Sequence, residues 1–156
     1  MGYRKIRNHE AAHAVVAIHF GVPFNRITQY KVHFPIGAEL SPHFKSILAA
    51  GCLGEFYEEW AGCIAYNEHY RNRGVPEKEC ITPIEIALTQ FTEKNYPEDF
   101  SLFTSGGTFN KSEYEEVAKA TWSIVLEKWN DIETLSHMVH IRHEMSYAEV
   151  LELLKK

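Results

Sequence analysis

Apolar residues recur at helical spacing in five stretches of the chain. These stretches cover residues 4–20, 43–65, a segment opening at 82, 111–137, and a short segment opening at 146. Gly21 and Pro23 mark the end of the first helix, because neither residue favours continuation of a helix at that point. Thr82 and Pro83 open the third, with Thr82 as N-cap and Pro83 at the first helical position. The pattern predicts a mainly α protein.

The segment from residue 24 to residue 34 has a different pattern. Apolar Ile27, Tyr30, Val32 and Phe34 alternate loosely with polar residues, which predicts one or two short strands. Segments rich in proline, glycine and polar residues read as turns or loops at 35–42, 67–79 and 96–110. We therefore expect an α+β fold, mainly α with a small β-sheet, followed by a C-terminal helical bundle.

The first helix contains the sequence His9-Glu10-Ala11-Ala12-His13. His9 and His13 stand one turn apart on one helical face, so both imidazoles can bind one Zn²⁺. Glu10, at the next position, can reach a water molecule on the metal and act as general base. Alanine and valine surround these polar residues, and a metal would satisfy them on a helix that is otherwise buried.

His19 has the spacing of a third ligand but not the required surroundings. It follows His9 by ten residues, as in metallopeptidases with the HExxHxxGxxH pattern, where a glycine breaks the helix. Val16 occupies the glycine position here, and an unbroken helix turns His19 to another face. We therefore expect His19 to be an ordinary core or surface residue.

Composition narrows the class of protein. Hydrophobic residues make up 45% and charged residues 24%, as in an ordinary globular chain of 156 residues, which predicts one domain over 1–156. A net charge of -5 with no basic stripe gives no reason to expect nucleic acid. No apolar run approaches the roughly 20 residues of a membrane span. The three cysteines, Cys52, Cys63 and Cys80, lack CxxC spacing, so we expect free thiols in a reducing cytoplasm.

The segment around the histidines resembles a known family. Residues 7–17, RNHEAAHAVVA, are similar to the HEAGHAVVA signature of the FtsH-type zinc metallopeptidases, with Ala12 in place of the usual glycine. Residues 22–28, 47–55 and 145–150 are similar to later parts of that family's peptidase domain, so the resemblance covers nearly the whole chain. It implies an HExxH zinc endopeptidase with a polypeptide substrate, of a kind expected in bacteria and phages. We expect a metal-site half over 1–95 and C-terminal helices over 96–156.

The resemblance leaves two differences. The chain has no GxxxxGK[ST] phosphate loop, so we expect a stand-alone, ATPase-independent peptidase domain that forms at most a small homo-oligomer. The family's third metal ligand is an Asp early in a downstream helix, and the matching region 82–87 offers Glu85 instead. Glutamate can bind zinc, yet Glu85 also fits a helix-capping position. Glu55 is the second choice, while Glu58, Glu59 or no protein ligand at all remain open.

Two functions follow from this sequence. The first is a zinc metallopeptidase in which Glu10 is the general base; Tyr30, His33 and His43 are candidates by position to stabilise the oxyanion. The second is a catalytically silent zinc-binding domain that acts as a protein-interaction module. Glu10 favours the enzyme, because a structural zinc site needs no base beside it.

Overall fold

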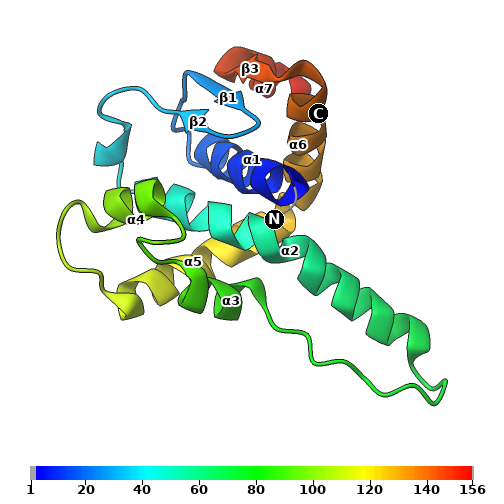
Figure 1. Ribbon diagram of the computed structural model, residues 1–156. Helices are drawn as coiled ribbons and strands as arrows, with labels where there is room; N and C mark the ends of the chain where they lie inside the picture. Colours follow the sequence, from blue (N-terminus) through cyan, green and yellow to red (C-terminus); the bar gives the residue numbers. More distant parts are fainter. Residues whose placement is uncertain (1–2, 156) are drawn as a thin grey trace.

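The computed structural model describes residues 3–155 and shows a mainly α fold with a small three-stranded sheet, as the sequence predicts. Its elements are α1 (Tyr3–His19), β1 (Arg26–Thr28), β2 (Val32–His33), the 3-10 helix η1 (Ala38–Leu40), α2 (Phe44–Tyr70), α3 (Pro83–Gln90), α4 (Pro97–Thr104), α5 (Lys111–Glu127), α6 (Trp129–Arg142), β3 (Glu144–Ser146) and α7 (Tyr147–Leu153). Figure 1 shows α1 and α2 near the centre of the molecule. Helices α3, α4 and α5 lie on one side of α2, and the opposite side holds the sheet together with α6 and α7.

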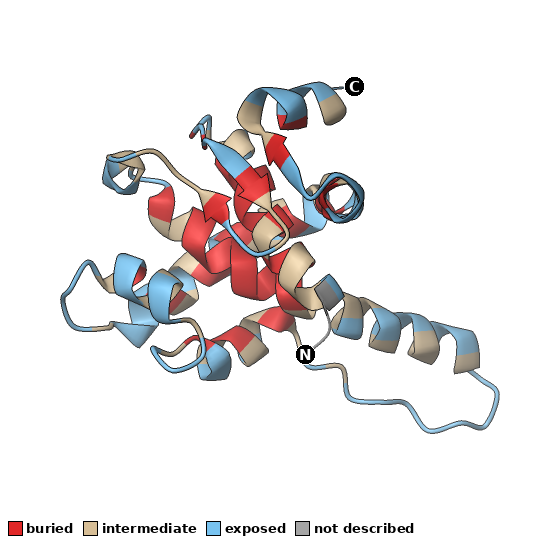
Figure 2. Ribbon diagram, turned by 45° about the horizontal axis from the view of Figure 1, so that its top comes forward, coloured by how far each residue is buried: buried red, intermediate tan, exposed pale blue. Residues whose placement is uncertain are grey.

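The core is built on the packing of α1 against α2. Both helices present small buried residues, including Ala11, Ala12 and Ala14 on α1 and Ala49 and Ala50 on α2. Small side chains let two helix backbones approach closely, because little volume separates them. Figure 2 shows that the buried residues gather where these helices meet, while the distal part of α2 is exposed.

The sheet joins two distant parts of the sequence. Its strand order is β2-β1-β3, and both pairings are antiparallel, with Ile27 opposite Val32 on one side and opposite Met145 on the other. The sequence pattern did not predict β3, a strand of three residues between two helices. Because β3 belongs to the last part of the chain, the predicted division at residue 95 does not separate two structural halves.

Three other boundaries differ from the sequence prediction. The helix expected over 111–137 is two helices, α5 and α6, that meet at Lys128. The change of direction lets α5 pack on α2 while α6 packs on α1, which one straight helix could not do. The second helix continues to Tyr70, five residues beyond the predicted end. The segment 96–110, expected to be a loop, contains the helix α4.

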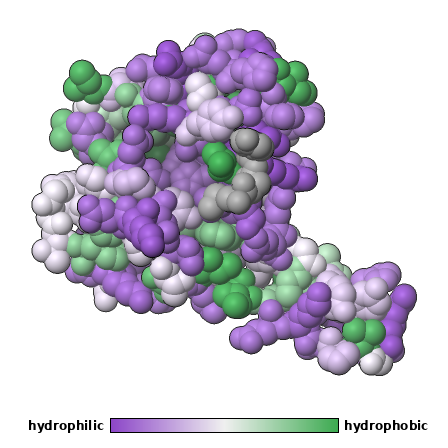
Figure 3. Space-filling view, viewed as in Figure 1, coloured by the Kyte–Doolittle hydropathy of each residue, from purple (hydrophilic) through white to green (hydrophobic). Residues whose placement is uncertain are grey.

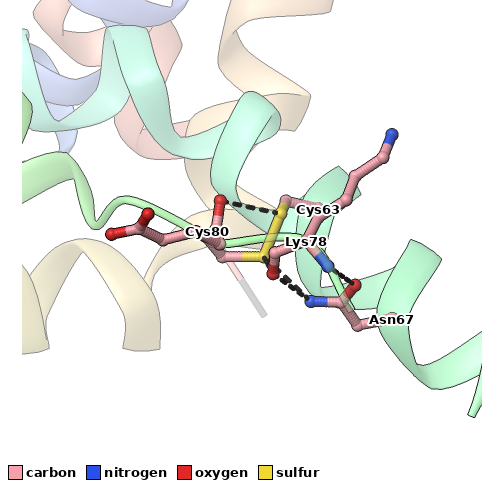
Figure 4. Close-up of a disulfide and its surroundings, with 5 residues drawn as sticks. Cys63, Asn67, Lys78 and Cys80 are labelled. Atoms are coloured by element: carbon pink, nitrogen blue, oxygen red, sulfur yellow. Dashed lines mark hydrogen bonds between the residues drawn. A yellow bond between two sulfur atoms is a disulfide. The ribbon is translucent and has the colours of Figure 1, made fainter. Parts of the chain in front are cut away.

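The distal part of α2 and the returning segment before α3 form an arm, residues 61–82, that extends away from the body (Figures 1 and 2). A disulfide joins Cys63 of α2 to Cys80 of the returning segment, so the prediction of free thiols at these positions is wrong; Cys52 is a buried free thiol. Asn67 strengthens the link, since its side-chain amide donates to the Lys78 carbonyl and its side-chain oxygen accepts from the Lys78 N–H, both at 2.8 Å (Figure 4).

The helices were also compared with the requirements of a membrane span. Within residues 3–155, none of the helices combines the length and the apolar character needed to span a membrane.

Candidate metal centre

His9 and His13 lie buried on the face of α1 that meets α2. Their ring centroids are 4.6 Å apart, and the planes are nearly perpendicular. One nitrogen from each ring and a carboxylate oxygen of Glu10 lie within 4.8 Å of one another. The structure therefore brings together the three residues of the HExxH sequence in an arrangement that could hold a metal ion.

Hydrogen bonds on the far side of each ring fix the direction in which the imidazoles point. Nδ1 of His9 lies 3.0 Å from Glu55 Oε1, and Nδ1 of His13 lies 2.6 Å from the Ile47 carbonyl oxygen. Carboxylate and carbonyl oxygens only accept hydrogen bonds, so both Nδ1 atoms donate. Both Nε2 atoms consequently face inward, and in a neutral ring each carries a lone pair.

Asp99, on the first turn of α4, completes the cluster. Its Oδ2 lies 2.9 Å from Nε2 of His9 and 3.1 Å from Nε2 of His13. Three potential acceptors thus converge on one point, and acceptors repel unless a cation or protons lie between them. A buried cluster of this kind fits a metal ion well.

The two distances from Asp99 Oδ2 to the imidazole nitrogens are close to those of a zinc site. Tetrahedral Zn²⁺ with bonds of about 2.0–2.1 Å holds its ligand atoms about 3.3 Å apart. The observed 2.9 and 3.1 Å require an expansion of only a few tenths of an ångström. Two histidines and one carboxylate are also a known ligand set for catalytic zinc, which keeps a fourth position for water. The geometry fits zinc, although it does not by itself identify the metal.

The pKa values of the cluster reflect the same need for a cation. Burial by itself lowers the pKa of His9, but Asp99 and Glu55 outweigh it and raise that pKa to about 10. The pKa of His13 is also raised, since Asp99 overcomes the effect of burial. Burial would raise the pKa of Asp99, yet the two histidines hold it far below its usual range. The cluster therefore retains protons wherever no metal takes their place.

Gly51 of α2 makes room for the two imidazoles. A Cβ atom at this position would lie 2.5 Å from Nε2 of His9 and 2.5 Å from both Cε1 and Nε2 of His13. Gly54, one turn further along, allows the same close approach to Ala12 and to the Asn8 carbonyl. These two glycines explain how α1 can place its histidines directly against the backbone of α2.

Glu10 lies beside the cluster and faces the cleft described below. Its Oε2 accepts a hydrogen bond of 3.1 Å from the backbone N–H of Val32 on β2. Burial raises the pKa of Glu10, while the neighbouring histidines oppose that effect. A carboxyl group with a raised pKa accepts a proton more readily than an ordinary carboxylate does.

The structure places Asp99, and not the predicted third ligand Glu85, in contact with the two imidazoles. Glu85 is exposed on α3, where its backbone N–H donates to the N-cap side chain of Thr82, so its position is that of a capping residue. Glu55, the second choice, contacts Nδ1 of His9 and not the inward-facing Nε2. The other two candidates pair with residues of α1: Glu58 with Arg4 and Glu59 with Lys5. Asp99 is the acidic residue placed against both imidazoles.

A signal for Asp99 was present in the sequence. Tyr96-Pro97-Glu98-Asp99 places a proline at the first helical position and an acidic residue in the first turn, which is a helix start. The resemblance called for an Asp early in a downstream helix, and Asp99 has that position. The sequence pattern predicts a loop over 96–110, so it does not indicate the helix that carries Asp99.

A cleft of about 720 Å³ opens at the cluster. Glu10, His13 and Asp99 line it from inside, the segment from Tyr30 to Glu39 forms one wall, and α4 forms the other. Lys31 and Glu98 pair across it at 3.4 Å. Ile36, which lines the cleft, and Leu40 of η1 are both exposed. Figure 3 shows apolar side chains on this side of the molecule, over the segment between β2 and α2.

The remaining candidate residues lie in different places. Tyr30 is on the cleft wall and 61% exposed, so it can reach a molecule bound there. His33 lies on β2, with its pKa lowered by burial and by Arg26 and Lys31. His43 stacks on Phe20 at 4.2 Å, and His19 is exposed with its ring against the same phenylalanine. His19 is therefore outside the cluster, as its helical position predicts.

Comparison with protein-family models, with curated proteins and with solved structures finds no match to this chain. The resemblance to the FtsH-type peptidases therefore remains a prediction from the residues quoted above.

Proposed function

We propose that this chain is a zinc metallopeptidase of the HExxH type, related to the FtsH-type peptidases and independent of an ATPase. The observation that carries the proposal is the convergence of His9 Nε2, His13 Nε2 and Asp99 Oδ2 at the inner end of a cleft, with Glu10 beside them. The hydrogen bonds at both Nδ1 atoms support a role as metal ligands, because metal-binding histidines usually donate from the other nitrogen.

His9, His13 and Asp99 would hold the ion. When bound, zinc supplies Lewis acidity and lowers the pKa of a water ligand to about 7. Glu10 accepts the proton of the attacking water and returns it to the nitrogen of the leaving amine. The hydrogen bond from the Val32 N–H keeps the Glu10 carboxylate at the inner end of the cleft for both transfers.

The sheet supports a polypeptide substrate. β2 is an edge strand, and its residues line the cleft, so an extended segment can add to the sheet by main-chain hydrogen bonds. Only an unfolded or locally extended segment offers its backbone in this way. We therefore propose unfolded or accessible protein segments as substrates.

The disulfide bears on the compartment in which the chain works. Disulfides persist mainly in oxidising surroundings. Cys63–Cys80 therefore favours an oxidising compartment over the reducing cytoplasm expected from the cysteine pattern. This part of the proposal is separate from the chemistry of the cleft.

The alternative is a catalytically silent zinc domain. A missing or altered third ligand would favour this alternative, whereas Asp99 supplies a carboxylate against both histidines. The carboxylate of Glu10, which lines an open cleft, has no use in a silent domain.

The Glu10→Gln variant tests the two functions. We expect the wild-type chain to bind one equivalent of zinc and to cleave an unfolded labelled protein. Glu10→Gln should keep the zinc and lose cleavage by at least about 100-fold, because general-base catalysis contributes about 10²–10⁴-fold. A wild-type chain that binds zinc but cleaves no unfolded substrate would support the silent domain, and one that binds no zinc would refute both.

A further inference from the structure

Tyr96 connects α4, the helix that carries Asp99, to His9. It is the N-cap residue of α4, three residues before Asp99. Its hydroxyl donates a hydrogen bond of 2.9 Å to Glu55 Oε2, while Oε1 of the same carboxylate accepts from His9 Nδ1. Its ring stacks on the His9 imidazole, with centroids 5.4 Å apart and an interplanar angle of 13°.

The two contacts restrain different movements of His9. The stacked ring prevents the imidazole from tilting out of its plane, and the hydroxyl holds Glu55, which in turn fixes the rotation of the imidazole through Nδ1. Glu55 is only 3% exposed, so little water can reach its Oε2 atom to replace the hydrogen bond from the Tyr96 hydroxyl. Without that hydroxyl, a buried carboxylate oxygen would lose its partner and Glu55 would be free to reorient.

The same segment forms part of the cleft wall. Pro97, Glu98 and Leu102 of α4 line the cleft, while Tyr96 and Asp99 at the start of α4 contact the cluster. The ring of Tyr96 also stacks on Phe91, which precedes α4 and belongs to the aromatic core beneath it. Docking of one short helix therefore positions the cleft wall, Asp99 and His9 together.

We propose that Tyr96 is a positioning residue of the metal centre, which acts through Glu55 to hold His9 Nε2 in place for the metal. This inference rests on the proposed zinc site but not on peptidase activity. Residues that orient metal-binding histidines typically change metal affinity by 10–100-fold when they are replaced. We expect an effect of that size from the loss of one hydroxyl group.

The test is the Tyr96→Phe variant, which keeps the stacked ring and removes the hydroxyl. Zinc affinity, measured by competition with a chelator, should fall by about 10–100-fold. The visible spectrum of the cobalt-substituted protein should also change, because it reports the geometry of the ligands. Tyr114→Phe is the matched control, since the buried Tyr114 hydroxyl has no hydrogen-bond partner among the described residues. This control should leave both measurements unchanged.

A double-mutant cycle shows whether Tyr96 acts through Glu55. Adding Tyr96→Phe to a Glu55→Leu chain should change zinc affinity less than it does in the wild type, because leucine fills the buried position but bonds neither the Tyr96 hydroxyl nor His9 Nδ1. Equal effects in both backgrounds, or wild-type zinc affinity and cobalt spectrum in Tyr96→Phe, would overturn the inference. If the Tyr96→Phe variant failed to fold while Glu55→Leu folded and bound zinc as the wild type does, the role through Glu55 would be overturned too. Absence of zinc from the wild type would overturn the proposed function and this inference together.

Discussion

Gly51→Ala is the sharpest test of how the metal centre is built. The added methyl carbon would lie 2.5 Å from three atoms of the two imidazoles, whereas carbon contacts normally lie at about 3.5–4.0 Å. The imidazoles or the helix must therefore move by about 1 Å. Metal–ligand distances are maintained to about 0.2 Å, so a displacement of this size is incompatible with the site.

The expected result has two parts. Zinc affinity should fall by at least about 100-fold, since both histidines are displaced and the effect should exceed that of a supporting residue. The metal-free chain should lose about 1–3 kcal/mol of unfolding free energy, as is usual for overpacking. Chelator competition measures the first quantity, and denaturant unfolding with chelator present measures the second.

Two glycines on the same helix serve as controls. Gly62 is exposed, and a Cβ there meets nothing within 4 Å, so Gly62→Ala should add about 0.5–1 kcal/mol of stability and leave zinc affinity unchanged. Gly54→Ala would clash with Ala12 and the Asn8 carbonyl, so it reports the cost of separating α1 from α2 without direct contact with the imidazoles. Gly51→Ala that binds one zinc with wild-type affinity would refute the reasoning.

Three further results are expected. Asp99→Asn should weaken zinc binding by at least about tenfold and Glu85→Gln should not, because Asp99 contacts both histidines whereas Glu85 is exposed on α3. Similar effects of the two variants in chelator competition would contradict this assignment. Zinc affinity should rise between pH 6 and pH 8, by up to about tenfold per pH unit for each proton displaced. The reason is that the pKa of His9 is raised to about 10, so the metal must replace a proton on this imidazole. A zinc affinity that does not change with pH in chelator competition would contradict this prediction. Reduction of the Cys63–Cys80 disulfide, or replacement of both cysteines by serine, should lower the free energy of unfolding by roughly 3 kcal/mol, the usual value for a closed loop of this length. It should also make residues 61–82 accessible to protease. An unchanged unfolding curve and digestion pattern would show that the arm does not need the disulfide.

The α1 helix and its chemistry were accessible from the sequence because they depend on local spacing. His9, Glu10 and His13 are held in register by one helical turn, and an apolar helix predicts burial without knowledge of the rest of the fold. Thr82 and Ser146 were equally accessible as helix starts, since each caps the backbone three residues ahead. Local rules were sufficient in each of these cases.

The missing part of the site depended on tertiary structure. Asp99 is 86 residues from His13 in the sequence and contacts it because α4 packs on α2. The spacing of apolar residues along the chain does not reveal this packing. A helix of eight residues is also too short to display a clear apolar stripe. Glu85 has the local features of a first-turn acidic residue, so the rule that found its helix also favoured Glu85 as the ligand, whereas the structure places Asp99 against the histidines.

The disulfide and β3 were missed for a related reason. Cys63 and Cys80 are brought together by the turn at the end of a helix that continues beyond its predicted end, so their spacing alone did not pair them. β3 has only three residues, and its strand conformation depends on pairing with β1. Each of these features exists through a partner far away in the sequence.

The pairing of β1 with β3 also sets the order in which the protein can be completed. Residues 26–28 are synthesised well before their second neighbour, residues 144–146, because the helices α2 to α6 lie between them in the sequence. A two-stranded hairpin alone is at best marginally stable in water, so β1 and β2 gain a lasting position only when β3 arrives. The cleft wall that includes β2 is therefore finished only after β3 has been synthesised. A nascent chain that has not reached β3 already carries His9, Glu10 and His13, yet it has no lasting surface on which to hold another polypeptide.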